Sequence, residues 1–426
     1  MNLEKNVPEI RFNGFSGEWA QRPFGDCFDN IPNNTLSRAD LNYEYGIAKN
    51  VHYGDVLIKF GEILDASDTS IPFVTDENVV SKQKHAALKN GDIVIADAAE
   101  DSTVGKCTEL FNIDEQVILS GLHTIAVRPN LPFASKYLGY YLNSSSYHDQ
   151  LLPLMQGTKV LSISKTALKN TSVNFPSANG EQIQIGNYFQ KLDSLINQHQ
   201  QKHDKLSNIK KAMLEKMFPK QGETMPEIRF KGFGGEWEEK ELEYIVEKAV
   251  DNRGKTPPTS SNGEHPLLEV ASLGSFKPDY SAVLKYVDEN TYNSWFRSHI
   301  QEGDILFSTV GNTGLVSLMD DFKGAAIAQN IVGFRSVNNN DSNFIYSMFQ
   351  LEENLNKAKR IEMGAVQPSV KVSQLIKIKY MISLDSNEQK RIGSVFKLLD
   401  TLINQHQQQI IKLNNIKQAC LSKMFV

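Results

Sequence analysis

PEIRFNGFSGEW, residues 8–19, occurs a second time as PEIRFKGFGGEW, residues 226–237. A second repeat follows each copy: the 38-residue segment that begins at Glu181 returns at Glu388 with 24 positions unchanged. The long segments that separate the two repeated elements have mostly diverged. A chain that repeats the same two flanking elements and varies the segment between them is typical of two different recognition modules on one scaffold.

The second repeat is predicted to form a long helix in both copies. Its seam positions step almost wholly by alternating fours and threes, which is the heptad spacing of a coiled coil. The seam consists of Ile185, Phe189, Leu192, Ile196, His199, His203, Leu206, Lys210, Met213 and Met217 in the first copy, and of Ile392, Phe396, Leu399, Ile403, His406, Ile410, Leu413, Lys417, Cys420 and Met424 in the second.

Histidine and lysine occupy the same two seam positions in both copies: His199 with His406, and Lys210 with Lys417. Polar residues in a seam usually fix register and partner, so we interpret them as pairing determinants. The alternative is a slight rotation of the helices that lets these side chains reach solvent.

A helix of this length is a rod of roughly 57 Å at about 1.5 Å per residue, and it cannot bury its apolar stripe alone. The partner of matching length is the other copy, so the sequence predicts an intramolecular two-helix coiled coil. Parallel pairing would place both globular segments at the same end, whereas antiparallel pairing would place them at opposite ends; we favour antiparallel. The alternative is that each helix docks separately on its own domain.

Turn-rich segments place the predicted boundaries. Residues 1–177 are expected to form an N-terminal segment with a first domain, 178–225 a central helix with a linker, 226–385 a second domain and 386–426 a C-terminal helix. The first helix is expected to end at Phe218-Pro219.

The two variable segments are predicted to share a mixed α/β fold. Turn-then-strand elements are expected at 91–96, 303–308 and 54–58, further strands at 123–128 and 330–335, and short helices at 137–147 and 344–356. The predicted fold class is therefore α/β: two mixed domains joined by a long antiparallel two-helix coiled coil in a pseudo-twofold internal repeat.

Composition limits the function. The chain has 426 residues, is 40% hydrophobic and carries a net charge of −5 with an isoelectric point near 6.0. This balance argues against nonspecific coating of nucleic acid, so any DNA binding must come from local patches or from a partner. The three cysteines form no CxxC pair, and neither a signal peptide nor a membrane-spanning run is visible, so a cytoplasmic protein is expected.

Catalytic motifs are not visible in the sequence. Residues 252–256 end like a phosphate-binding P-loop, but Ala249 stands where a glycine is needed, and Pro257 follows at once. The carboxylates form no paired spacing shared by the two copies, and we interpret them as solvated surface. No cofactor and no metal ligand set is expected in this chain.

The remaining sequence features are polar glycine loops and basic residues, which are suited to binding another molecule. Residues 155–162 and 362–369 align as glycine turns that carry amide, hydroxyl and basic groups, and residues 308–314 form a second polar glycine loop. Such loops suit phosphates and base edges, because glycine permits close backbone approach. The candidate DNA-binding residues are Lys49, Lys59, Lys82, Lys84, Lys106, Lys159, Ser162 and Lys165 in the first domain, and Arg253, Lys255, Thr256, Arg297, Asn312, Thr313, Gln367, Ser369 and Lys371 in the second. A scattered basic surface is the alternative for any single residue.

Taken together, the chain resembles the DNA-specificity subunit of type I restriction-modification enzymes over its full length. The most specific elements are the two PEIRF…GEW motifs and the two helices that begin Glu-Gln-x-x-Ile-Gly. The loop that ends in Gln367-Pro368-Ser369 is similar to that of the family's second target-recognition domain. In the first copy Val160 stands opposite Gln367, which leaves the equivalent base contact there open.

The resemblance implies a non-catalytic subunit in which each target-recognition domain reads one half of a bipartite DNA site. It implies that the helices bind two modification subunits, which use S-adenosylmethionine to methylate adenine, and that restriction subunits using ATP and magnesium join the complex. The coiled coil would act as a ruler, and a rod of roughly 57 Å accommodates readers about 34 Å apart. The competing interpretation is a two-domain scaffold that does not read DNA, or an orphan paralogue that sequesters modification subunits.

Overall fold

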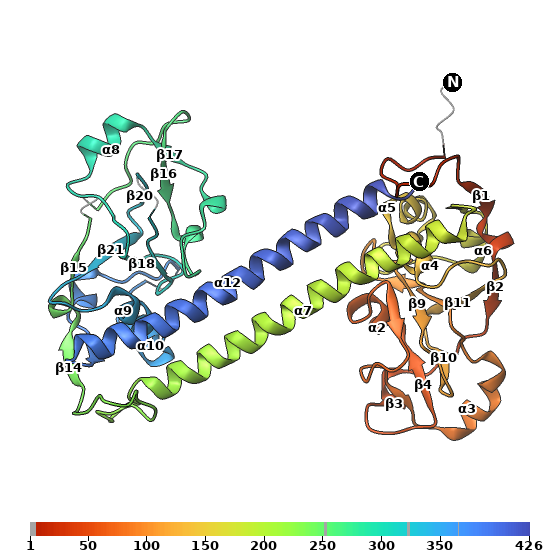
Figure 1. The fold of residues 1–426 in the computed structure, drawn as a ribbon, viewed down its shortest axis with the longest axis horizontal. Coiled ribbons are helices and arrows are strands. Elements are labelled where there is room, and N and C mark those ends of the chain that lie inside the picture. The colour runs from red at the N-terminus through yellow and green to blue at the C-terminus, as the bar shows by residue number, and fades with distance from the viewer. Residues whose placement is uncertain (1–5, 251–253, 322–323, 365) are drawn as a thin grey trace. The chain divides into compact units, whose positions relative to one another are not determined.

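The computed structural model describes residues 6–250, 254–321, 324–364 and 366–426 (Figure 1). Two helices are much longer than the rest: α7 (Asn179–Met217) and α12 (Ser386–Lys423). The chain divides into two compact units, and each long helix contributes to both of them. Unit 1 comprises residues 1–198 and 410–426, and unit 2 comprises residues 199–409. The units therefore divide within the helices rather than at their ends.

Unit 1 is built on a five-stranded sheet of order β2-β11-β7-β9-β5, beside a four-stranded sheet of order β10-β4-β6-β3. Its strands are β1 (Ala20–Pro23), β2 (Phe28–Ile31), β3 (Leu41–Asn42), β4 (Ala48–Val51), β5 (Ile63–Asp65), β6 (Phe73–Val74), β7 (Ile93–Ala96), β8 (Ala98–Ala99), β9 (Cys107–Phe111), β10 (Val117–Ser120), β11 (Thr124–Pro129), β12 (Leu161–Ser162) and β13 (Ser172–Phe175). Its short helices are α1 (Phe24–Cys27), α2 (Tyr53–Ile58), α3 (Glu77–Gln83), α4 (Tyr137–Asn143), α5 (Ser145–His148) and α6 (Lys165–Lys169).

Unit 2 has a four-stranded sheet of order β15-β21-β18-β19 and a three-stranded sheet of order β17-β16-β20. Its strands are β14 (Glu238–Glu241), β15 (Val246–Lys248), β16 (His265–Leu268), β17 (Tyr286–Val287), β18 (Ile305–Ser308), β19 (Val316–Leu318), β20 (Ala326–Ile327), β21 (Ile331–Ser336) and β22 (Lys379–Ile382). Its short helices are α8 (Glu289–Trp295), α9 (Ser342–Phe349), α10 (Glu352–Lys359) and α11 (Val372–Leu375).

The central strands of both units are apolar on both faces, as strands buried on two sides must be. In β7, Ile93 and Ile95 pack into the cluster that includes Phe189 of α7, whereas Val94 and Ala96 pack into a second cluster on the opposite face. β18 repeats the arrangement in unit 2, with alternate residues divided between the cluster around α12 and a second cluster. Each sheet is thus held against a long helix, and the mixed α/β prediction is confirmed.

One predicted strand is wrong and two predicted helices are divided. Residues 54–58 lie in helix α2, whose start is capped by His52: its Nδ1 accepts from the Gly54 N–H at 3.2 Å. Gly54-Asp55 matches the Gly-Asp pattern that precedes β7 and β18, which is why the sequence predicts a strand. Here, however, Asp55 pairs with Arg38 and Lys59 instead of closing a turn before a strand. The helix predicted at 137–147 is interrupted at Ser144, and the one at 344–356 is interrupted at residues 350–351.

The two long helices run antiparallel within each unit. In unit 1, Phe189 near the start of α7 shares a core with Leu421 and Met424 at the end of α12. In unit 2, Phe396 near the start of α12 shares a core with Leu214 and Met217 at the end of α7. Every position of the predicted seam is buried or half-buried. Pairing and docking on the domains therefore occur together, since the same helix faces enter the domain cores.

The matched polar seam residues have protein partners. His199 and His406 face each other, with their Nδ1 atoms 2.9 Å apart. Lys210 forms an ion pair with Asp400 at 2.5 Å, and Lys417 forms one with Asp193 at 2.7 Å. In unit 2 the lysine lies on α7 and the aspartate on α12, whereas in unit 1 the lysine lies on α12 and the aspartate on α7, as a twofold repeat requires. Because a mispaired register would leave largely buried lysines and aspartates without partners, the two ion pairs support the pairing-determinant interpretation.

The PEIRF motif forms a clasp, which we define as Arg11 with Ile10 in unit 1 and Arg229 with Ile228 in unit 2. The clasp arginine binds the glutamate in the first turn of one long helix through Nε and Nη2: Arg11 holds Glu181 at 2.7 Å for both bonds. The isoleucine N–H donates to a carbonyl in the last turn of the other long helix. Each clasp therefore joins the start of one helix to the end of the other, which only antiparallel pairing permits.

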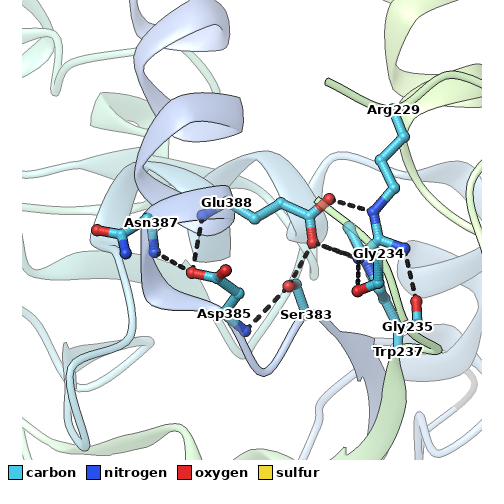
Figure 2. Close-up of polar contacts among 8 residues, drawn as sticks. All are labelled: Arg229, Gly234, Gly235, Trp237, Ser383, Asp385, Asn387 and Glu388. Atoms are coloured by element: carbon cyan, nitrogen blue, oxygen red, sulfur yellow. Dashed lines mark hydrogen bonds and ion pairs between the residues drawn. The ribbon is translucent and has the colours of Figure 1, made fainter. Parts of the chain in front are cut away.

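Figure 2 shows how Arg229 of the unit 2 clasp meets Glu388. The Glu388 side chain is fully buried. Glu388 accepts hydrogen bonds from Arg229 at 2.6 and 2.9 Å, from Trp237 Nε1 at 3.2 Å and from Ser383 Oγ at 2.5 Å. Arg229 also donates to the carbonyls of residues 234 and 235, so the Gly-Gly-Glu-Trp part of the motif closes around it. A helix N-terminus favours a carboxylate, and here Arg229, Trp237 and Ser383 all donate to the same one.

The clasp generates a prediction about unequal stability. Arg11→Ala leaves the buried Glu181 carboxylate with no other side-chain donor among the described residues, whereas Arg229→Ala leaves Glu388 with Trp237 and Ser383. Removing one partner of a buried ion pair costs about 3–5 kcal/mol, so we expect the larger loss from Arg11→Ala and a smaller one from Arg229→Ala.

Urea unfolding of the full chain, followed by hydrogen exchange in each unit, measures both losses. The Arg11→Ala/Glu181→Gln double variant is the control, because it removes the orphaned charge and should recover part of the stability. Equal destabilisation by the two single variants would contradict this account.

Candidate nucleic-acid interface

The two aligned glycine turns are equivalent hairpins. In unit 1 the backbones of Gln156 and Ser162 exchange hydrogen bonds of 2.9 and 2.8 Å, and in unit 2 those of Met363 and Ser369 exchange two of 2.9 Å. Gly157 and Gly364 have φ of +116° and +94°, and a Cβ at either would overlap the carbonyl oxygen three residues on. Only glycine fits this combination, so the turn geometry is set by the residue that the sequence repeats.

Each hairpin is fixed to a second loop of its own unit. In unit 2 the Gly311 N–H donates to the Pro368 carbonyl at 2.8 Å, and the Val370 N–H donates to the Thr309 carbonyl at 2.8 Å. In unit 1 the Ile163 N–H donates to the Asp97 carbonyl at 2.9 Å, beside the short β8–β12 ladder. The structure thus brings together the two polar glycine loops predicted in the second domain and places a matching pair in the first.

The hairpin tips are exposed. Lys159 and Val160 are exposed in unit 1, as are Val366 and Gln367 in unit 2, where the Val366 side chain is 99% exposed. An apolar side chain that lies fully in water gains nothing for the fold, so the tips are suited to contact with another molecule.

Most of the predicted DNA-binding residues lie on the surface. The exposed set is Lys59, Lys82, Lys84, Lys159, Ser162, Lys165, Lys255, Thr256, Arg297, Asn312, Gln367 and Lys371, and Ser369 is half-buried. Arg253 lies outside the described residues. Lys59 is already engaged, since Tyr43 Oη accepts from its Nζ at 2.9 Å and Asp55 lies 3.4 Å away.

Three predicted contacts are placed elsewhere by the structure. Lys49 is 8% exposed, and its Nζ donates to the Ala66 carbonyl at 2.7 Å and the Asp68 carbonyl at 3.0 Å; burial lowers its pKa. Lys106 is half-buried and donates to the Leu57 carbonyl at 2.9 Å, and burial lowers its pKa too. Thr313 is buried, and its hydroxyl donates to Glu362. These side chains satisfy internal acceptors, so they stabilise loops instead of facing a ligand.

The interpretation of all carboxylates as solvated surface is also wrong. Glu181 and Glu388 bind the clasp arginines, Asp193 and Asp400 bind the seam lysines, and Asp92 and Asp304 bind Arg128 and Arg335. The signal was the repeat itself, because each carboxylate recurs at an equivalent place in the second copy.

Within the described parts of the chain, His, Cys, Asp and Glu side chains form no group of three or more that could hold a metal ion. Across the same residues, no helix combines the length and apolar character needed to cross a membrane.

Two divergent α/β domains that present equivalent hairpins from one duplicated helical frame define a modular recognition protein. The chain belongs to the family described as the type I restriction modification DNA specificity domain, whose profile matches residues 18–208 and 234–415.

Specificity subunits of known type I restriction systems are similar to this chain in sequence or in fold. A specificity subunit assigned to the type I restriction enzyme MjaX of Methanocaldococcus jannaschii is 23% identical over 437 residues, covering 98% of this chain and 95% of its own. The MjaVIII specificity subunit of the same organism is 22% identical over 277 residues, covering 63% of this chain and 64% of its own. The crystal structure of a type I restriction-modification S subunit from M. genitalium has the same fold, with a TM-score of 0.63, 15% identity and 99% of both chains covered.

The burial of Lys49 and the exposure of Lys159 predict opposite effects for substitutions at these two lysines of the first domain. Lys49→Met leaves two carbonyl acceptors unsatisfied and should cost about 1–3 kcal/mol of folding stability. Lys159→Met should leave stability within about 0.5 kcal/mol of the parent, but weaken binding to any duplex and lower the salt slope by about one unit. Thermal unfolding and DNA titration at several salt concentrations separate the two. An unchanged melting temperature with weakened DNA binding for Lys49→Met would contradict the assignment.

Proposed function

We propose that this chain is the sequence-specific DNA-recognition subunit of a type I restriction-modification complex. Each domain, unit 1 through residues 155–162 and unit 2 through residues 362–369, reads one half of a bipartite site. The observation that carries the proposal is the pair of equivalent, exposed hairpins, which differ in side chains while their backbone hydrogen bonds are the same. A repeated backbone with changed tips is what two readers of different sequences need, since base edges are read by side chains.

The chain itself has no catalytic role in this proposal. Two modification subunits dock on the long helices and supply the S-adenosylmethionine site for adenine methylation, and restriction subunits supply ATP- and magnesium-dependent cleavage. The complex acts in the cytoplasm on double-stranded DNA. The net charge of −5 fits this arrangement, because phosphate affinity then comes from local cations and from the partners.

A scaffold that binds modification subunits without reading DNA is the second candidate. Methylome mapping of a strain with and without this gene separates the two: a bipartite motif that loses adenine methylation on deletion supports the specificity subunit. A methylome unchanged by deletion, in a strain where the modification subunit is expressed, would exclude the DNA-reading function.

The division between the two units predicts modular specificity. Exchanging residues 238–385 for the matching segment of a related subunit should change one half of the methylated motif and preserve the other, because the exchanged segment lies between the second clasp motif and α12. Methylation mapping of the exchanged strain measures this. A change in both halves would contradict independent reading.

In the second hairpin we expect one side chain to read a base and another to bind a phosphate. Gln367 is exposed at the tip, and an amide can pair with both N6 and N7 of adenine in the major groove. Lys371 is exposed four residues later and suits a phosphate. Gln367→Ala should weaken binding to the recognised site by about 1–3 kcal/mol and change nonspecific binding little. Lys371→Ala should weaken both and lower the salt slope by about one unit.

Fluorescence titrations of the assembled methyltransferase with recognised and scrambled duplexes, at several salt concentrations, measure both effects. If Gln367→Ala weakens both duplexes equally, the residue braces the loop and does not read a base.

A further inference from the structure

His123 of unit 1 has an unusual backbone. It lies between β10 and β11 with φ of +51°, in the left-handed region that residues other than glycine rarely adopt. Two hydrogen bonds hold it there: the His123 carbonyl accepts from the Asp97 N–H at 3.0 Å, and the preceding Leu122 carbonyl accepts from the Tyr53 N–H at 3.4 Å. A strained conformation that its surroundings enforce is a feature of functional positions.

Two contacts orient the His123 side chain. Its Nδ1 lies 3.3 Å from Asp97 Oδ1, and its ring meets the Tyr53 ring edge-on at 5.3 Å. The side chain is nevertheless 53% exposed. In the neutral imidazole, a carboxylate beside Nδ1 favours the tautomer with the proton on that nitrogen, and Nε2 is then a hydrogen-bond acceptor. Among the described residues, nothing forms a hydrogen bond with Nε2.

Asp97 ties this imidazole to the first hairpin. Its carbonyl accepts from the Ile163 N–H at 2.9 Å, directly after the strand that closes the hairpin. The hairpin carries Val160 where the second hairpin carries Gln367, so it lacks the amide reader of its counterpart.

The equivalent position in unit 2 shows the difference. Asn330 makes the same backbone contact, accepting from the Thr309 N–H at 2.8 Å, but its Oδ1 is buried. Unit 1 therefore displays a fixed polar ring at a position where the side-chain oxygen of unit 2 points inward.

We propose that His123 is a specificity-determining residue of the first domain, with Nε2 accepting a hydrogen bond from the exocyclic amino group of a base. In the major groove only adenine N6 and cytosine N4 offer such a donor, so the contacted base is adenine or cytosine. Asp97 is a positioning residue that holds the ring and its tautomer. This inference rests on the DNA-reading function proposed above and assigns one contact within it.

His123→Asn is the decisive variant, because asparagine tolerates the left-handed backbone while its shorter side chain cannot reach the same atom. His85→Asn, at an exposed histidine of the same unit, is the matched control. Each variant is assembled with modification subunits and titrated with the duplex identified by methylome mapping and with a scrambled duplex. His123→Asn should bind the recognised duplex about 5- to 100-fold more weakly and the scrambled duplex within about twofold of the parent. His85→Asn should match the parent on both.

A second arm uses duplexes altered in only one half of the site. The His123→Asn complex should lose discrimination in one half and keep it in the other, and Asp97→Asn should reduce the same discrimination by a smaller factor. Thermal unfolding checks the fold, and His123→Gly, which relieves the backbone strain, gives the same DNA readout if His123→Asn is destabilised.

The inference is overturned if the His123 variants bind the recognised duplex like the parent, or if they lose affinity equally for both duplexes. A parent complex that does not distinguish the two duplexes would instead contradict the proposed function itself.

Discussion

The arrangement of each unit depends on a buried ion pair between an arginine near the N-terminal edge of the domain and a glutamate in the first turn of a long helix. Arg11 and Arg229 each make two short bonds to carboxylates that are 0% exposed. A buried carboxylate is tolerated only with a full set of donors, so the motif cannot leave this helix end without a large cost. Since the isoleucine N–H of the same segment donates to the last turn of the other helix, one short segment fixes both helix ends.

The polar residues of the helix seam fix the register in which the two long helices pair. Apolar seam residues alone would allow the helices to slide, whereas the Lys210–Asp400 and Lys417–Asp193 pairs each have one satisfactory register. The charges lie where the helices meet the domain cores, so helix pairing and domain docking are coupled. This coupling explains why the repeated segments changed little: a substitution in either motif would disturb a helix and a domain together.

The hairpins are free of those constraints. Their backbones are fixed by internal hydrogen bonds and by one glycine each, while the side chains at their tips contribute nothing to the core. The tip residues can therefore change without loss of fold, and the two units have used this freedom differently. Unit 2 presents an amide at Gln367, whereas unit 1 presents Val160 at its hairpin tip and an imidazole at His123, which lies against Asp97. The repeated helices and clasps keep the geometry of the two units alike, whereas the exposed side chains of the hairpin tips differ between the units.

The sequence by itself determined the duplication, the extents of the long helices, the seam positions and the equivalence of the hairpins, because repeats and heptad spacing are local patterns. It also located the glycine turns, since the backbone there excludes other residues. Only the tertiary structure decided that Lys49 faces inward, that residues 54–58 are helical and that Asp193 and Asp400 are buried partners. Those outcomes depend on groups distant in the chain that desolvate a charge or satisfy it, and no local pattern records which groups those are.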